Sequence, residues 1–174
     1  LIKPEAPVVG TGMEAVVPEA MGRIVRARAE GKIIYADSHK VTVKYKGDKN
    51  GPQTHLITKF KRTNPNSTCY SQGPAVSTGD EVKTGDLLID GPACENGELA
   101  LGRNLLIAYC SFDGLEYEDA IIISDRLVKE DVLTSINIEE YEAPVLETKL
   151  GPEELTRDIP NVSEGDLANL AQDG

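Results

Sequence analysis

The stretch KVTVKY, residues 40–45, alternates strictly between polar and apolar side chains. Because successive side chains of a β-strand point to opposite faces, this alternation predicts a strand with one buried face and one face in water. Two further apolar stretches precede it, at residues 23–26 and 32–35, and a turn-rich loop follows at residues 47–52. These residues are predicted to form a small β-meander, and residues 56–60 are the next candidate strand.

A short internal repeat, Thr78-Gly79-Asp80 and Thr84-Gly85-Asp86, follows at a spacing of six residues. Gly-Asp is a turn signal. Turns this close together are typical of a compact barrel-sandwich in which the chain changes sheets every few residues. The apolar residues 99–109 are predicted to be a buried strand with a bend at Gly102.

Helices are expected to be few and short. One is predicted from Ser124 to about Asp131, another from Pro152, and a third after the capping pattern of residues 163–166. The predicted fold class is therefore mainly β, with barrel- or sandwich-type sheets and a few short helices.

The formal net charge of −11 is distributed unevenly over the 174 residues. Residues 1–62 contain 12 Lys and Arg against 6 Asp and Glu, whereas residues 63–174 contain 6 against 23. An acidic chain argues against a free-standing nucleic-acid-binding domain, which normally has a strongly basic face. The basic charges of the first part are interpreted as solvated strand faces.

The three cysteines, Cys69, Cys94 and Cys110, are widely spaced and have no CxxC pair or neighbouring His. This spacing argues against a zinc site and against a disulfide framework, and it fits a reducing compartment. No apolar run reaches the length of a membrane span, about 18 residues. No signal peptide is visible at the start of the sequence.

Two adjacent acids, Glu118 and Asp119, lie between a glycine turn and an apolar run in GLEYEDAIII, residues 114–123. Burying an unpaired carboxylate costs several kcal/mol, so the pair is expected to face water, a cation or a charged ligand. Neighbouring residues of a regular strand point apart, so both acids serve one site only if the chain bends there. Gly114 allows such a bend. A solvated loop and a cation site both remain open.

Several longer motifs occur in order over nearly the whole chain. They are GTGME (residues 10–14), LITKFKRTNPNSTC (ending at residue 69), GDEVKTGDLLIDGP (79–92), GELALGRN (97–104) and TKLGPEELTRDIPNVSE (148–164). Together with the acidic motif they resemble the bacterial and plastid-type β subunit of DNA-directed RNA polymerase. That subunit is many times longer, so the resemblance implies an internal fragment that has no polymerase activity alone.

The resemblance also implies a domain organisation. Residues 1–70 would be a β-meander segment that leads into a barrel. Residues 71–148 would be part of a double-psi β-barrel that carries the acidic pair near the catalytic centre. Residues 149–174 would be a helical lead-in to the flap, a mobile element of the family.

The family's site residues carry over to one motif. Glu118 and Asp119 would be catalytic residues near the second Mg²⁺ and the incoming nucleoside triphosphate, in contact with the ion directly or through water. Mg²⁺ is typically held by one or two carboxylates together with waters and substrate phosphates, which suits a site that fills with the nucleotide. Gly114 and Tyr117 are expected to lie near the nucleotide. Glu116 stands where the family often has Asn, and it is interpreted as solvated.

The partners implied by the resemblance are the polymerase β′, α, ω and σ subunits, of which β′ holds the first Mg²⁺. The assembly would contact template DNA, the RNA transcript and nucleoside triphosphates, but no membrane, in the cytoplasm or a plastid stroma. One alternative is a biotinyl/lipoyl-like carrier domain, because GDEVKTGDLL resembles its sheet-switching turns. That class needs a lysine-bearing hairpin, which is not seen after Leu88. The other alternative is a non-catalytic scaffold or interaction module.

Overall fold

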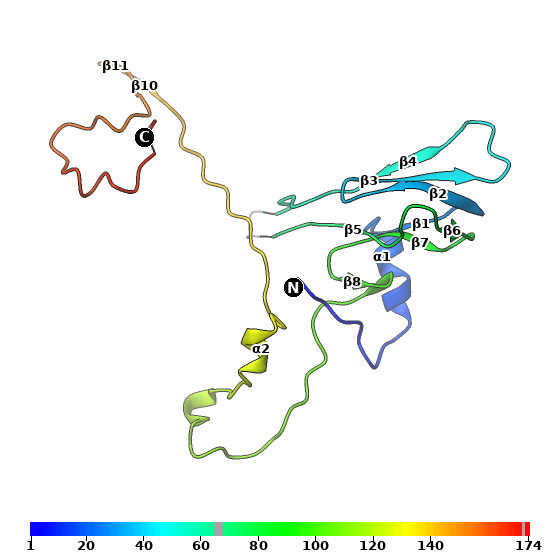
Figure 1. Cartoon of the computed structure of the whole chain (residues 1–174). Coiled ribbons are helices and arrows are strands. Elements are labelled where there is room, and N and C mark those ends of the chain that lie inside the picture. Colours follow the sequence, from blue (N-terminus) through cyan, green and yellow to red (C-terminus); the bar gives the residue numbers. More distant parts are fainter. Residues whose placement is uncertain (65–67, 172) are drawn as a thin grey trace. The chain divides into compact units, whose positions relative to one another are not determined.

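The computed structural model describes residues 1–64, 68–171 and 173–174, so the centre of the NPNST motif, residues 65–67, lies outside the described residues. The chain forms two compact units, Leu1–Glu139 and Glu140–Gly174. Its regular structure is mainly β, as predicted, and Figure 1 shows short strands with a few one-turn helices. The strands of the described residues form small sheets that do not close into a barrel. The division of the chain into three segments by role stays a prediction.

The first unit contains two principal antiparallel sheets. A four-stranded sheet has the order β4-β3-β2-β6 and a three-stranded sheet has the order β1-β7-β5. The strands are β1 (Val25–Arg26), β2 (Gly31–Ala36), β3 (Lys40–Tyr45), β4 (Gln53–Leu56), β5 (Gly73–Pro74), β6 (Glu81–Val82) and β7 (Leu87–Asp90). A hairpin of β8 (Cys94–Glu95) and β9 (Glu98–Leu99) follows.

The alternation in β3 has the predicted effect on burial. Val41 and Val43 are fully buried, whereas Lys40 and Lys44 are exposed. Ile33 of β2 pairs with Val43, and the register then shifts before the next pair. This bulge interrupts the regular alternation, so that two consecutive residues of β2, at positions 34 and 35, are both exposed.

The core joins residues of both principal sheets. Its members are Ala27, Ile33, Val41, Val43, Tyr45, Ile57, Val82, Leu88 and Ile89. Strand β4 ends at Leu56, earlier than the predicted strand of residues 56–60. Ile57 is nevertheless buried in the core, and its N–H donates to the carbonyl of His39 at 2.7 Å.

The Gly-Asp repeat forms two equivalent turns, as predicted. The Asp80 and Asp86 carboxylates each accept a backbone N–H three residues earlier at 2.7 Å. Gly79 donates its N–H to the Ile33 carbonyl and Gly85 donates to the Ala27 carbonyl, both at 2.8 Å. The strands after the turns enter different sheets, because β6 pairs with β2 and β7 pairs with β1. The chain therefore changes sheets between the two turns.

Replacing Gly79 or Gly85 by Ala is expected to destabilise the chain by about 1–2 kcal/mol each, because both have positive φ angles, 102° and 90°. Urea unfolding followed by circular dichroism measures the change. Gly73→Ala is the matched control, since Gly73 has an ordinary φ and open space where a Cβ would lie. Equal midpoints for all three variants would contradict a conformational role for the turn glycines.

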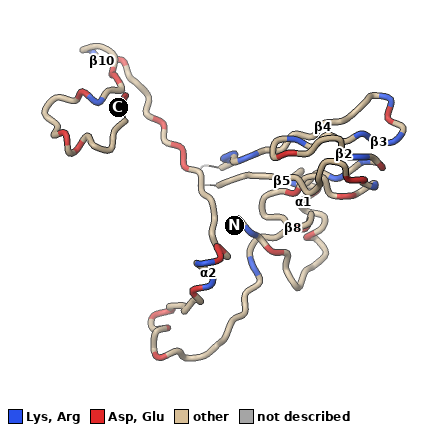
Figure 2. Tube along the Cα trace, viewed as in Figure 1, with Lys and Arg blue, Asp and Glu red and all other residues tan. Residues whose placement is uncertain are grey.

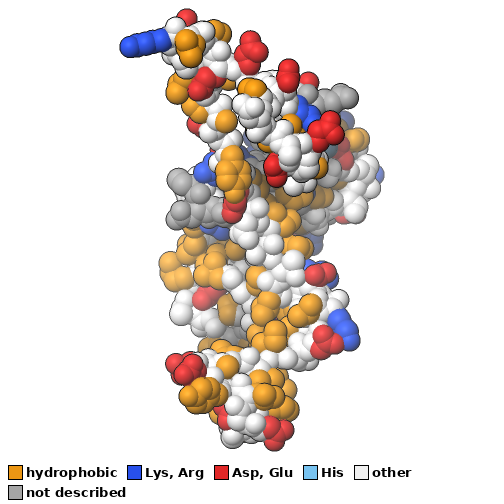
Figure 3. Space-filling model, turned by 90° about the vertical axis from the view of Figure 1, so that its left-hand side faces the viewer, with side chains coloured by type: hydrophobic (Ala, Val, Ile, Leu, Met, Phe, Trp, Pro, Cys, Tyr) orange, Lys and Arg blue, Asp and Glu red, His pale blue; other side chains and the backbone are white. Residues whose placement is uncertain are grey.

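Residues 100–123 differ most from the predicted fold. The predicted buried strand at residues 99–109 is wrong. Strand β9 ends at Leu99, and beyond it the side chains of Leu101, Leu106 and Tyr109 are exposed. Gly102 makes an isolated bridge with Glu5. An extended apolar segment is buried only where neighbouring strands cover it, and the described residues provide no strand beyond this bridge. Figure 3 shows exposed hydrophobic side chains at its lower end, the level of this segment in Figure 1.

The helices agree only in part with the prediction. Helix α2 (Arg126–Lys129) lies within the predicted range, and the Arg126 N–H donates to the Ser124 hydroxyl at 3.3 Å. Two short helices, η1 (Met13–Ala15) and α1 (Val17–Ala20), were not predicted. None of the described helices is long and apolar enough to cross a membrane.

The two short helices predicted within residues 149–174, from Pro152 and after Ser163, are not found in the residues that the structure describes. Pro152 belongs to β11 (Gly151–Pro152), which pairs with β10 (Glu147–Thr148). Ser163 and Asp166 do hydrogen-bond through their side chains, at 2.8 Å, but the chain continues in turns. A short helix needs packing to offset its unfavourable nucleation, and Gly165 weakens it further.

Candidate functional site

The acidic pair lies in a tight turn, η2 (Tyr117–Asp119), between β9 and α2. The backbone is left-handed at Glu118, with φ 55° and ψ 51°, and also at Asp119, with φ 63°. A second left-handed turn precedes it at Asp113 and Gly114, with φ 53° and 73°. The chain therefore bends where two adjacent acids require a bend to serve one site. Left-handed residues other than glycine cost about 1 kcal/mol or more each, and such strain is typical of functional sites.

All four residues predicted at the site, Gly114, Tyr117, Glu118 and Asp119, are exposed. Both carboxylates are therefore accessible to a ligand from solvent. Within the described ranges, no group of three or more His, Cys, Asp and Glu side chains is placed to hold a metal ion. The turn itself offers adjacent hard oxygen donors, the ligand chemistry that Mg²⁺ prefers.

The third acid of the motif, Glu116, is not simply solvated as predicted. Its carboxylate accepts the Ser111 hydroxyl at 2.5 Å through one oxygen and the Phe112 N–H at 3.0 Å through the other. The hydrogen bond from Ser111, aided by backbone N–H groups, lowers the pKa of the Glu116 carboxyl. Its side chain thus closes the loop that leads into η2.

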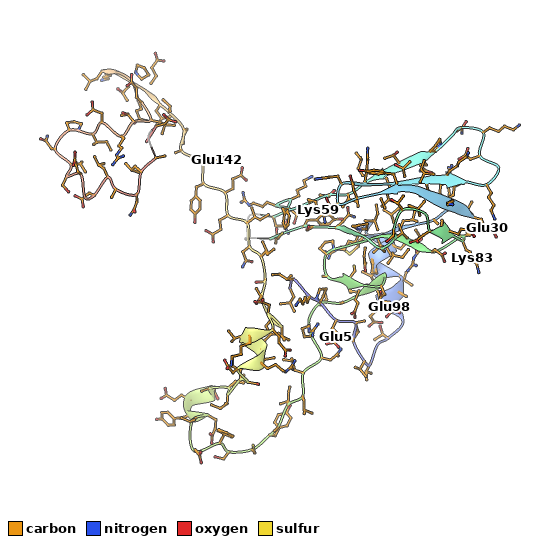
Figure 4. The ribbon with its side chains drawn as sticks, in the orientation of Figure 1. Glu5, Glu30, Lys59, Lys83, Glu98 and Glu142 are labelled. Atoms are coloured by element: carbon orange, nitrogen blue, oxygen red, sulfur yellow. The ribbon has the colours of Figure 1, made fainter. Side chains whose placement is uncertain are left out.

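The N-terminal segment, residues 1–6, contacts both ends of residues 102–134, the stretch that carries the acidic pair. Glu5 pairs with Gly102 through its backbone, and its carboxylate accepts the Asn104 N–H at 3.1 Å. At the other end, the Ile2 N–H donates to the Thr134 carbonyl at 2.9 Å. Glu5 lies beside the start of this stretch in Figure 4. These contacts are not predictable from the sequence, because no local pattern signals a pairing between residues about a hundred positions apart.

A shallow pocket of about 250 Å³ lies beside this N-terminal segment, away from the acidic turn. It is lined by Pro7, Glu14, Leu99, Leu101, Gly102, Arg103 and Asn104. The Glu14 carboxylate already accepts the N–H groups of Thr11 and Gly12, at 3.0 and 2.9 Å. The acidic pair, Glu118 and Asp119, is therefore not part of the lining of this pocket.

The basic first part of the chain has the surface character predicted for it. Figure 2 shows Lys and Arg along and around β2, β3 and β4, and Asp and Glu along the segments that follow η2. Arg28 pairs with Asp48 and lies over the Tyr45 ring, 4.9 Å from its centre. These basic side chains are solvated or locally paired, as the sequence indicated.

Comparison with known proteins defines the class of protein. Residues 26–174 match the family model described as RNA polymerase Rpb2, domain 6. The chain therefore belongs to the RNA polymerase Rpb2/β-subunit family.

Two relatives are more specific. Over its whole length the chain is 49% identical to the DNA-directed RNA polymerase subunit beta of Staphylococcus aureus and to that of Staphylococcus epidermidis. The chain spans 15% of the length of these relatives, so it corresponds to one part of such a subunit. The carrier-domain alternative is left without support.

Proposed function

We propose that this chain is part of the catalytic β subunit of DNA-directed RNA polymerase, where Glu118 and Asp119 act near the second Mg²⁺ and the incoming nucleoside triphosphate. Family membership supports the subunit assignment. The observation that carries the site is the pair of exposed, adjacent carboxylates in a turn whose backbone is left-handed at both residues.

The chemistry of this pair fits a weakly held magnesium ion. Glu118 and Asp119 would hold the ion directly or through water, and the triphosphate would supply most of its remaining charge. In phosphoryl transfer, magnesium stabilises the charge that develops on the attacking and leaving oxygens. The role of the two carboxylates is to position the nucleotide-bound ion for that step.

Two neighbouring residues suit proximity to the nucleotide. Gly114 has no atom within 4 Å of the place where a Cβ would lie, which leaves room for a ligand to approach the backbone. Tyr117 is the exposed aromatic residue that begins η2, directly before the acidic pair. Both residues remain part of the proposed nucleotide site.

The activity would belong to the assembled polymerase. The proposed partners are the β′, α, ω and σ subunits, with β′ holding the first Mg²⁺, and template DNA and the RNA transcript bound through the full complex. The exposed apolar residues of the stretch 105–123 favour this assignment, because a surface of this kind is normally covered in an assembly.

Taken alone, this chain is expected to self-associate, because Leu106, Tyr109 and residues 121–123 expose apolar side chains. Size-exclusion chromatography with light scattering and binding of a hydrophobic dye would detect this. Replacing Leu106 and Ile121 together by Ser should reduce both signals, whereas Leu56→Ser, at an exposed position of β4, should change them less. A monodisperse monomer without dye binding would contradict the expectation.

A non-catalytic scaffold is the second candidate function. It differs from the catalytic role in one respect, because in a scaffold the acidic pair would not approach the nucleotide. Single-nucleotide addition by assembled polymerase that carries Glu118→Ala and Asp119→Ala tests the difference. A slow rate supports the catalytic role, and a wild-type rate at every magnesium concentration supports the scaffold.

A further inference from the structure

The loop that precedes the acidic pair is closed by the side chain of Glu116. We infer that Glu116 is a positioning residue: its carboxylate latches residues 111–116 and so holds Glu118 and Asp119 where they act on the nucleotide-bound magnesium. This inference rests on the function proposed for the pair.

The geometry of the latch involves both carboxylate oxygens. One accepts the Ser111 hydroxyl at 2.5 Å and the other accepts the Phe112 N–H at 3.0 Å. The loop between them is tight, since the Leu115 N–H donates to the Phe112 carbonyl at 3.0 Å and Gly114 has a left-handed φ. Hydrogen bonds to an ionised acceptor are about twice as strong as neutral ones. With both oxygens engaged in the loop, Glu116 acts as a closure rather than as a third metal ligand.

The latch acts on the acidic pair through the backbone. Glu116 is the residue directly before η2, so fixing Glu116 fixes the point at which that turn begins. Glu118 and Asp119 follow in a left-handed backbone that persists only where the surrounding structure holds it. Loss of the closure would let η2 relax and would move both carboxylates together.

The test is single-nucleotide addition by assembled polymerase at saturating substrate over a magnesium titration. Glu116→Ala is expected to slow addition about tenfold, because a displacement of catalytic groups by about 1 Å can cost up to about a hundredfold. Raising Mg²⁺ should not restore the rate, since the defect is in geometry. Glu116→Gln keeps one amide oxygen as an acceptor and should recover most of the loss, and Ser111→Ala should have a smaller effect than Glu116→Ala.

Asp113→Asn is the matched control, because it removes a negative charge from the same loop. Among the described residues no hydrogen bond or ion pair of the Asp113 side chain is found, so the variant should keep the wild-type rate. Hydrogen exchange of the peptide that contains Phe112 gives an independent readout. Exchange should rise in Glu116→Ala and stay near wild type in Asp113→Asn.

The outcomes separate this inference from the proposed function. If Glu116→Ala keeps the wild-type rate while the Glu118→Ala, Asp119→Ala double variant is slow, the latch is overturned and the proposed function stands. If Glu116→Gln is as slow as Glu116→Ala and extra Mg²⁺ rescues both, Glu116 acts through its charge and the latch is overturned. If the double variant has the wild-type rate, the proposed function fails. In the double-variant background, Glu116→Ala should add no further loss.

Discussion

Assembled polymerase that carries Glu118→Ala and Asp119→Ala together is expected to add nucleotides about 10²–10³-fold more slowly than the wild type, the typical cost of removing an electrostatic stabiliser of the transition state. The loss should be smaller if the carboxylates act through water. Both side chains are exposed, so their removal should leave subunit assembly and template binding intact. Pyrophosphorolysis should weaken in parallel, because the reverse reaction uses the same ion.

The decisive measurement is the rate of single-nucleotide addition at saturating substrate over a magnesium titration. Partial recovery at high Mg²⁺ would identify a defect in occupancy, and a constant defect would identify one in geometry. Glu153→Ala with Glu154→Ala is the matched control, since it removes another exposed, adjacent acidic pair and should leave the rate unchanged. A wild-type rate for the Glu118/Asp119 double variant throughout the titration would reduce that pair to a solvated loop.

Leu88→Ala is expected to cost about 2–5 kcal/mol of folding free energy, the range for truncating a large apolar side chain in a packed core. Leu88 is fully buried on β7, in the core cluster that joins both principal sheets. A single domain has only about 5–15 kcal/mol of stability, so this change should remove much of the total.

Urea unfolding of the chain at low protein concentration, followed by circular dichroism, measures the loss. Leu106→Ala is the matched control, because the same side chain is fully exposed there and the expected change is within about 0.5 kcal/mol. Equal midpoints for the two variants would show that the sheets do not share the core described above.

The first part of the fold was predictable because its signals are local. The alternation of residues 40–45 specifies which face of β3 is buried, and the structure agrees, with Val41 and Val43 inside. The two Gly-Asp turns were also readable, since glycine at positive φ and an aspartate that accepts a nearby N–H need only a few consecutive residues. The switch of the chain between sheets follows from the short spacing of those turns.

The second part was predictable only in outline. The apolar run at residues 99–109 has the composition of a buried strand, but burial depends on neighbours that the described chain does not supply. At the capping pattern the Asp166 N–H donates to the Ser163 hydroxyl at 3.4 Å, as a helix cap would, but no helix follows, because capping alone does not offset the cost of nucleation. Pro152 follows a glycine into a small hairpin instead of starting a helix.

The sequence by itself determined the mainly β class, the sheet-switching turns, the family and the bend that two adjacent acids require, since all of these depend on residues close together in the chain or on motifs in order. Only the tertiary structure showed that Glu5 and Ile2 hold the two ends of the acidic stretch and that Glu116 closes the loop before it. Those contacts depend on which donor lies within about 3 Å of which carboxylate, and that distance is set by the folded path of the backbone rather than by residue type or spacing.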